Sequence, residues 1–417
     1  MPRLSVTEIN KKCAQLEARL NKGATEKGAS VCTNIDLAPN SYFLRRPSGI
    51  IELDMHTGGG LPAGGLSYIG GPDGAGKTFL LWKYIAMNQR LWGEQSAVAV
   101  AVSEAAPDHF FMRKCGVQIA IPEQMIAERV AARKSNGLPA FTKDELKSFR
   151  AKTVGQVKLL RGATGEELLG ALLECFVSGI FDILGLDSVS AILPDADAGK
   201  DLDENQKRAA AAGLLTKFFQ HYLNGTTGYS NQNRTTVIFT TQVRSNSKKA
   251  EAPAHIQKYL PDYTAQGAWA AKHGKLIDIM VKPGEKDKEK TNIEAVTTLG
   301  AAMAQRQKTV QVGKTVRYEI TKGKAGVHEG ITGEFPFNYA TLTDDQRMLV
   351  LQSISLGIAE EKNGVITFFD LQTHAPIPTL EKLPMDQLTG MMRADFELEL
   401  SMRLMLLASA GIECAYR

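Results

Sequence analysis

The sequence lacks a long apolar run and has few cysteines. No hydrophobic stretch approaches the roughly 18–20 residues needed to cross a bilayer, so we expect no membrane-spanning helix. The first residues lack the apolar core of a signal peptide, which favours a cytoplasmic protein. The five cysteines are scattered, odd in number and contain no Cys-x-x-Cys pair, which argues against a disulfide framework and a zinc site and for a reducing cytosol.

A strong excess of charge is also missing. Lysine and arginine total 49 and aspartate and glutamate 45, for a formal net charge of +4, so composition alone does not identify a nucleic-acid partner. Hydrophobic residues make up 43% and charged residues 23%, which is ordinary for a soluble globular protein. A chain of 417 residues exceeds one typical core, and we expect one large domain with smaller appendages.

Residues 1–49 have the pattern of a short arm. Apolar residues recur every three or four positions from Val6 to Leu20, and Ser5 to Glu8 has capping-box spacing, so a helix is predicted there. A linker (Gly23 to Ser30) and a short strand (Val31 to Ile35) follow. Such an arm buries little by itself. It either packs loosely or docks on a neighbouring subunit.

Between residues 50 and 340, short apolar runs alternate with helical stretches. This alternation predicts an α/β fold with a mainly parallel sheet covered by helices on both faces. Ligands of such sheets bind at the carboxyl ends of the strands. The predicted strands are Leu66 to Ile69, Ala97 to Val102, Ile183 to Leu186, Thr236 to Thr240, Ile277 to Val281 and Val316 to Ile320.

Three further segments stand outside this alternation. Glu128 to Lys158 carries many charges and is predicted to be a surface insertion. Pro283 to Lys290 is a charge run, interpreted as a solvated, mobile loop. Residues 341–417 are rich in leucine and methionine and predict a small C-terminal α/β domain containing a long helix from Met385 to Ala410.

A Gly-x-x-x-x-Gly-Lys-Thr motif follows the first predicted strand and precedes a helical stretch, the context required of a phosphate-binding loop (P-loop). In such a loop the backbone N–H groups hold the phosphates of ATP, Lys77 reaches the β and γ oxygens, and the Thr78 hydroxyl binds Mg²⁺. The predicted nucleotide-binding residues are Gly71, Pro72, Asp73, Gly74, Ala75, Gly76, Lys77, Thr78 and Phe79.

Polar side chains end three other predicted strands. Asp187 closes an apolar run, where a carboxylate is costly unless it meets a cation, and is therefore the expected second Mg²⁺ residue. Glu104 follows the second run and could act as general base toward the attacking water, although a plain surface glutamate is the alternative. Gln242 closes the fourth run, and its amide suits contact with a γ-phosphate.

With these motifs in order, the sequence resembles the bacterial RecA strand-exchange recombinases, including phage relatives of the UvsX class. The resemblance covers residues 50–338. It is carried by Gly59 to Gly64 leading into the P-loop, Ser103 to Asp108 with Arg113 to Val117, Leu186 to Pro194, and Thr241 to Arg244.

The resemblance implies roles for individual residues. It makes Glu104 the hydrolytic base and Gln242 the γ-phosphate sensor, and it places Asp108 and Phe111 at the adenine. It also matches Lys322 and Lys324 to two lysines that reach the neighbouring protomer's γ-phosphate. Taken alone, Lys322-Gly323-Lys324 is only a basic turn.

The resemblance also implies two DNA-binding loops. The first, Asp195 to Gln206, is acidic here, and the second runs from Arg244 to Gln266. In the second loop we expect cations to meet phosphates and aromatic rings to stack on bases, with an ordinary solvated loop as the alternative. The predicted DNA-binding residues are Arg244, Lys248, Lys249, Lys258, Tyr259 and Tyr263.

The sequence thus predicts an ATP- and Mg²⁺-dependent recombinase that forms helical filaments on single-stranded DNA and pairs it with homologous duplex DNA. Two other functions remain open. One is a ring-forming hexameric helicase with the same core, and the other is a regulatory ATPase that does not bind DNA.

Overall fold

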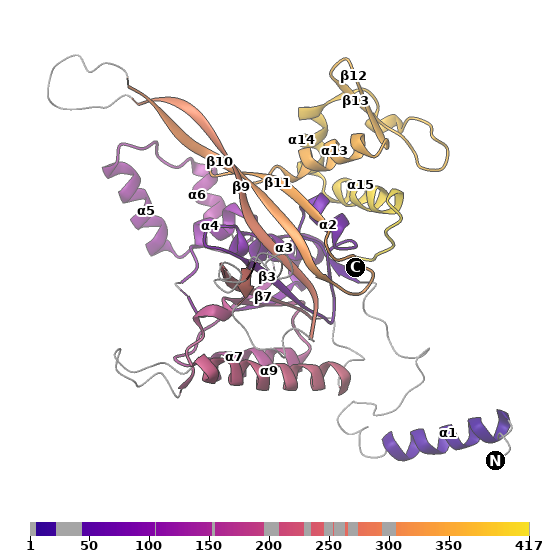
Figure 1. Ribbon diagram of the computed structural model, residues 1–417. Helices are drawn as coiled ribbons and strands as arrows, with labels where there is room; N and C mark the ends of the chain where they lie inside the picture. Colours follow the sequence, from indigo (N-terminus) through magenta and orange to yellow (C-terminus); the bar gives the residue numbers. More distant parts are fainter. Residues whose placement is uncertain are drawn as a thin grey trace.

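The computed structural model (Figure 1) describes residues 6–21, 44–104, 106–151, 155–195, 208–228, 235–245, 253, 263–265, 274–293 and 306–416. The helices are α1 (Val6–Asn21), α2 (Ile51–His56), α3 (Lys77–Trp92), α4 (His109–Lys114), α5 (Glu123–Ser135), α6 (Lys143–Phe149), α7 (Gly165–Ser178), α9 (Arg208–Gly228), α13 (Asp345–Ser355), α14 (Met385–Ala394) and α15 (Phe396–Ser409). The strands are β1 (Arg45–Arg46), β2 (Leu61–Pro62), β3 (Leu66–Gly71), β4 (Ala97–Val102), β5 (Gln156–Leu160), β6 (Ile183–Asp187), β7 (Thr236–Ser245), β8 (Tyr263–Ala265), β9 (Lys275–Ile293), β10 (Arg306–Gly323), β11 (Thr332–Asn338), β12 (Ala359–Lys362), β13 (Val365–Phe368) and β14 (Leu383–Pro384).

The central sheet has the order β11-β10-β9-β3-β7-β6-β4-β5. From β9 to β5 every neighbouring pair is parallel, and this confirms the predicted α/β fold with a mainly parallel sheet. The run Val316 to Ile320 differs, because β10 pairs antiparallel with both β9 and β11. Because β9 and β10 are antiparallel and follow each other in the chain, they need no helical crossover, whereas a parallel pair would need one.

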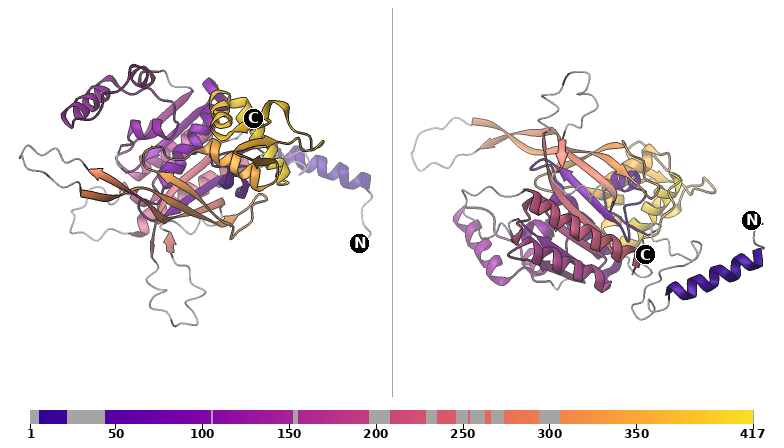
Figure 2. Two further views of the ribbon diagram at one scale, coloured as in Figure 1. Left: turned by 90° about the horizontal axis from the view of Figure 1, so that it is seen from above. Right: turned by 60° about the horizontal axis from the view of Figure 1, so that its bottom comes forward.

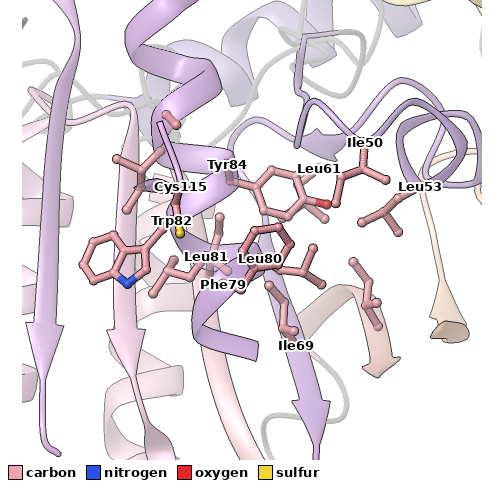
Figure 3. Close-up of a cluster of buried hydrophobic side chains, with 14 of the residues drawn as sticks. Ile50, Leu53, Leu61, Ile69, Phe79, Leu80, Leu81, Trp82, Tyr84 and Cys115 are labelled. Carbon is pink, nitrogen blue, oxygen red and sulfur yellow. The ribbon is translucent and has the colours of Figure 1, made fainter. Parts of the chain in front are cut away.

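Helices cover both faces of this sheet. On one face α3 and α4 pack over the strands, and Figure 3 shows the buried side chains of this layer, among them Phe79, Trp82 and Ile69. On the other face α7 and α9 lie side by side (Figure 2) and bury residues such as Phe176 and Phe219. Burial from both sides explains the nearly unbroken apolar sequences of the central strands.

The prediction of a loop from Pro283 to Lys290 is wrong, because these residues belong to β9. Strand β9 and its partner β10 form a long ribbon that projects beyond the body of the sheet (Figure 1). Backbone hydrogen bonds to β10 satisfy the peptide groups, while the side chains of residues 285–288 are exposed. Alternating charges are therefore compatible with a strand that has solvent on both faces.

The prediction that Glu128 to Lys158 is a surface insertion is only partly right, because the segment ends in a strand of the central sheet. The segment contains most of α5, all of α6, where Thr142 and Glu145 form a capping box, and the first residues of β5. Strand β5 pairs parallel with β4 at the edge of the sheet. The last residues of this segment therefore belong to the edge of the central sheet.

The predicted long helix from Met385 to Ala410 is wrong in one respect. Asp395 has an extended backbone and its side chain accepts hydrogen bonds from Glu397 N (3.0 Å) and Leu398 N (3.2 Å). It therefore caps a new helix, and the segment is divided into α14 and α15. These two helices, α13 and the β12–β14 sheet share a hydrophobic cluster, to which α2 contributes Ile51.

The predicted N-terminal helix is confirmed as α1, which lies apart from the other elements in Figure 1 and in the right view of Figure 2. The predicted strand from Val31 to Ile35 lies outside the described residues. Within the described part of the chain, no helix combines the length and the apolar character that a membrane span requires.

Candidate nucleotide-binding site

The P-loop connects the end of β3 at Gly71 to the start of α3 at Lys77. Gly74 and Gly76 adopt φ values of 67° and 111°, in the left-handed region that favours glycine. The Ala75 side chain is buried beneath the loop. The loop thus presents the N-terminus of α3, whose free N–H groups and dipole attract anions.

Lys77 lies inside this loop. Its Nζ donates to the carbonyl oxygens of Gly71 (3.0 Å) and Pro72 (2.9 Å). Burial lowers the pKa of Lys77, while the nearby carboxylates of Asp73, Asp187 and Glu104 act in the opposite direction. The ammonium is thus held at the mouth of the loop, where a phosphate would be bound.

Asp187 lies at the end of β6, directly opposite the P-loop. Its Oδ2 accepts a hydrogen bond from the Thr78 hydroxyl (2.8 Å) and its Oδ1 accepts one from the Thr240 hydroxyl (2.5 Å). Burial raises the pKa of Asp187, and the two hydroxyls oppose that rise. A hydroxyl and a carboxylate at this separation suit Mg²⁺, a hard cation that takes one or two protein oxygens together with substrate phosphates and water.

Glu104 follows β4, the neighbour of β6. Its Oε1 accepts a hydrogen bond from the Ser188 hydroxyl (2.6 Å), and its side chain is exposed. Ser103 joins the two strand ends, because its hydroxyl donates to Ser188 O and accepts from Ser188 N. The carboxylate is therefore held beside Asp187 and remains open to water.

Gln242 lies on β7, between β3 and β6. It is in register with Gly71, the first residue of the P-loop, and its backbone N–H donates to the Ser190 hydroxyl (2.8 Å). The order β3-β7-β6-β4 therefore brings Lys77, Gln242, Asp187 and Glu104 to one end of the sheet. A nucleotide phosphate, a divalent ion and a water could meet these groups together.

The residues expected at the adenine lie on α4. Asp108 caps this helix by accepting from Phe110 N (2.8 Å), and its other oxygen lies 3.8 Å from Arg129 of α5. Phe111 is half-buried against the core. Phe79 has a different environment, since its ring is buried edge-on against Phe337 at 5.0 Å. Only its backbone is placed to meet a nucleotide.

Lys322 and Lys324 lie at the opposite end of the sheet. Lys322 is in register with Asp278 of β9, which itself pairs with Tyr68 near the start of β3. Burial lowers the pKa of Lys322, and Lys324 and Lys275 lower it further by repulsion. These lysines are therefore not part of the site formed by their own chain.

Most residues predicted to bind DNA cannot be placed. Arg244 and Tyr263 belong to β7 and β8, which pair with each other, and the side chains of both lie outside the described residues. Lys248, Lys249, Lys258 and Tyr259 lie outside them entirely, as does the first loop after Asp195.

Two contributors to the site were not predicted from the sequence. Thr240 and Ser103 hold Asp187 and Ser188, and both lie at strand ends next to predicted residues. Their positions carried a signal, because hydroxyl residues at the carboxyl edge of a parallel sheet adjoin the ligand. Their hydrogen-bond partners depend on strand order, which the sequence does not give.

Among known proteins, the chain is similar to several that are named "Protein RecA". That of Solidesulfovibrio magneticus is 29% identical over 199 residues, covering 48% of this chain and 44% of the relative. That of Desulfovibrio desulfuricans is 29% identical over 233 residues, covering 55% and 51%. The chain thus spans about half the length of these relatives.

A third relative, from Leifsonia xyli subsp. xyli, is matched over more of its length. Its "Protein RecA" is 26% identical over 351 residues, covering 84% of this chain and 82% of the relative. No protein-family model matches the chain. The similarity therefore agrees with the α/β fold and extends beyond the P-loop region.

Proposed function

We propose that this chain is an ATP-dependent homologous recombinase that forms filaments on single-stranded DNA and promotes pairing and strand exchange. The observation that carries the proposal is the convergence of Lys77, Thr78, Asp187, Glu104 and Gln242 at one end of the sheet. The names of the relatives support it.

Each residue has a chemical task in this proposal. Lys77 and the loop N–H groups bind the β- and γ-phosphates, and Thr78 and Asp187 hold Mg²⁺, which neutralises charge on the phosphates. Glu104 orients the attacking water and accepts its proton. Gln242 contacts the γ-phosphate from β7, the strand that leads toward residues 244–266, where the proposed DNA contacts lie.

The position of Lys322 and Lys324 favours assembly. The P-loop follows Gly71, whereas Lys324 N donates to Leu276 O, next to Lys275, the partner of Leu66 at the start of β3. Five residues of strand separate the two ends by about 17 Å. The lysines therefore serve a neighbouring protomer's nucleotide or none, and ATP then acts across a subunit interface.

A ring-forming helicase would use the same interface, and a regulatory ATPase would lack the DNA contacts. Electron microscopy of the full chain with single-stranded DNA and a non-hydrolysable ATP analogue distinguishes the three. The recombinase predicts long helical filaments that require both components. Closed rings would favour the helicase, and unassembled particles would favour the regulatory ATPase.

A further inference from the structure

Strand β10 passes along the P-loop on the face of the sheet that is covered by α3. Val316 of this strand is buried, and a Cβ placed on Gly76 would lie 3.9 Å from it. Two residues earlier on the same face lies Lys314, which reaches Gly74. The β9–β10 ribbon thus lies along the P-loop, from Gly76 at the start of α3 to Gly74 at the exposed tip of the loop.

The ammonium of Lys314 donates to the carbonyl oxygen of Gly74. Its Nζ also lies 5.9 Å from the centre of the Phe337 ring, the partner of Phe79 in the core. Within the described residues it forms no ion pair, whereas Arg317 on the opposite face of β10 pairs with Glu334 (3.1 Å). The half-buried charge of Lys314 is thus directed at the loop.

Packing holds the next residue, Ala75, which is buried in the core, but it does not hold Gly74 itself. Gly74 has φ +67°, and a Cβ placed there would meet nothing within 4 Å. Asp73 and Gly74 are both exposed. The contact from Lys314 is therefore a tether from the rest of the chain to the tip of the loop.

The tether has a geometric consequence. In a trans peptide the C=O and the next N–H point in opposite directions. When Lys314 holds the Gly74 carbonyl toward β10, the N–H of Ala75 is directed to the other side of that peptide. There it donates to Pro72 O (3.2 Å), a carbonyl that a phosphate would replace as the acceptor. P-loops bind phosphate through such N–H groups, and a cation on the carbonyl strengthens the peptide dipole in the favourable sense.

We propose that Lys314 is a positioning residue of the P-loop, which orients the Gly74–Ala75 peptide for nucleotide phosphates and adds positive charge beside them. This proposal rests on the proposed nucleotide site but not on DNA binding or filament formation. It assigns part of the phosphate affinity to the β9–β10 ribbon.

The test uses three variants of the full chain. Lys314→Met keeps an unbranched apolar stem beside Phe337 and removes the ammonium, Lys314→Arg keeps a charged donor, and Lys286→Met is the matched control. Lys286 is the cross-strand partner of Lys314, is exposed and lines the same pocket of about 420 Å³. Among the described residues it forms no hydrogen bond or ion pair with the loop.

We expect Lys314→Met to raise the Kd for ADP and for a non-hydrolysable ATP analogue roughly tenfold, as a charge-assisted contact is lost. Its Kd should also depend less on salt. Lys314→Arg should recover most of the affinity and Lys286→Met should match wild type. Thermal midpoints without nucleotide should agree among all four proteins.

Two outcomes would overturn the inference and leave the proposed function standing. One is wild-type affinity in Lys314→Met. The other is a weak Lys314→Met that arginine does not rescue and whose nucleotide-free thermal midpoint is lowered, because the lysine would then only support the fold. Failure of the wild type to bind either nucleotide would instead reject the proposed function.

Discussion

At Asp187, burial and hydrogen bonding act in opposite directions on one carboxylate. Burial favours the protonated form and raises its pKa, whereas the hydroxyls of Thr240 and Thr78 stabilise the ionised form. In the proposed function Asp187 holds Mg²⁺ in its ionised form. The two threonines would then extend the pH range over which the proposed site holds the ion.

Thr240→Val tests this balance. Valine preserves the shape but removes the bond to Asp187 Oδ1, so the pKa of Asp187 rises and the acid limb of the ATPase pH profile moves to higher pH. A shift of roughly one pH unit is expected for a bond of about 1.5 kcal/mol. Thr236→Val is the control, since that hydroxyl bonds Pro62 O at the other end of β7. An unmoved acid limb in Thr240→Val would remove this role.

Glu104→Gln separates binding from hydrolysis. The amide can still accept the Ser188 hydroxyl, but it cannot take a proton from water, so hydrolysis should fall roughly 10²-fold or more while nucleotide binding persists. Lys77→Ala should instead weaken nucleotide binding, by about 1.5–3 kcal/mol. Turnover rates and equilibrium titrations measure the two effects. Equal turnover in Glu104→Gln and wild type would exclude Glu104 as the base.

Among the elements, α3 is held by ion pairs at its middle and near its C-terminal end. Its start carries the P-loop lysine, and farther along its length Lys83 and Arg90 pair with the C-terminal segment. Lys83 pairs with Asp345, and Arg90 pairs with Glu399 of α15 at 2.8 Å. Glu399 is fully buried and also accepts from Arg403 at 2.9 Å. The helix at the proposed nucleotide site is thus fixed to residues beyond 341.

Glu399→Gln should lower the free energy of unfolding by about 3–5 kcal/mol at neutral pH, because Arg90 and Arg403 lose the carboxylate that they share. Buried Arg403 then keeps only the more distant Asp54, at 3.7 Å, as a charged partner. Burial alone would raise the pKa of Glu399, but Arg403 and Arg90 hold it down at about 2. Its contribution is present above the ordinary value of 4.5 and is lost as pH falls toward 2. Urea unfolding at several pH values should show the two proteins converging in acid.

Exposed Glu397 of the same helix supplies the control. Glu397→Gln should change stability by no more than about 0.5 kcal/mol. If the two variants were equally stable at neutral pH, the buried charges would not join α15 to α3.

The sequence predicted the elements that are buried on both faces. The predicted strand Ala97 to Val102 has the same bounds as β4, because a strand that is buried on both faces of a parallel sheet has an unbroken apolar sequence. Exposed elements were less predictable. Strand β5 is half polar, the charges of β9 are typical of a loop, and α14 and α15 share a periodicity that continues across Asp395. Their structures depend on partners distant in sequence.

In the candidate site, too, the residues next to buried strands could be predicted and the others could not. The P-loop residues, Asp187, Glu104 and Gln242 could be predicted because each follows a recognisable strand. Lys314 could not, because its contact joins residues 240 positions apart. The division of the chain at residues 49 and 340 stays a prediction.

For the whole molecule, the two ends of the sheet lead to a prediction about mixed assemblies. The double variant Lys322→Ala, Lys324→Ala should bind ATP as a dilute monomer but lose DNA-stimulated hydrolysis. Mixing it with Lys77→Ala protomers should restore part of the activity, since some interfaces then combine an intact P-loop with an intact lysine pair. ATPase rates across mixing ratios measure this. Mixed filaments without restored activity would contradict a role across the interface.

The ion pairs of α3 also set an order of events during synthesis. Lys83 and its partner Asp345 are 262 residues apart, and Arg90 and Glu399 are 309 apart. A ribosome that adds about 5–20 residues per second needs roughly 15–60 s to cover the longer interval. During that time Arg90 of the nascent chain cannot pair with Glu399, which has not yet been synthesised. The helix at the proposed nucleotide site therefore reaches its final environment only after Glu399 has been synthesised.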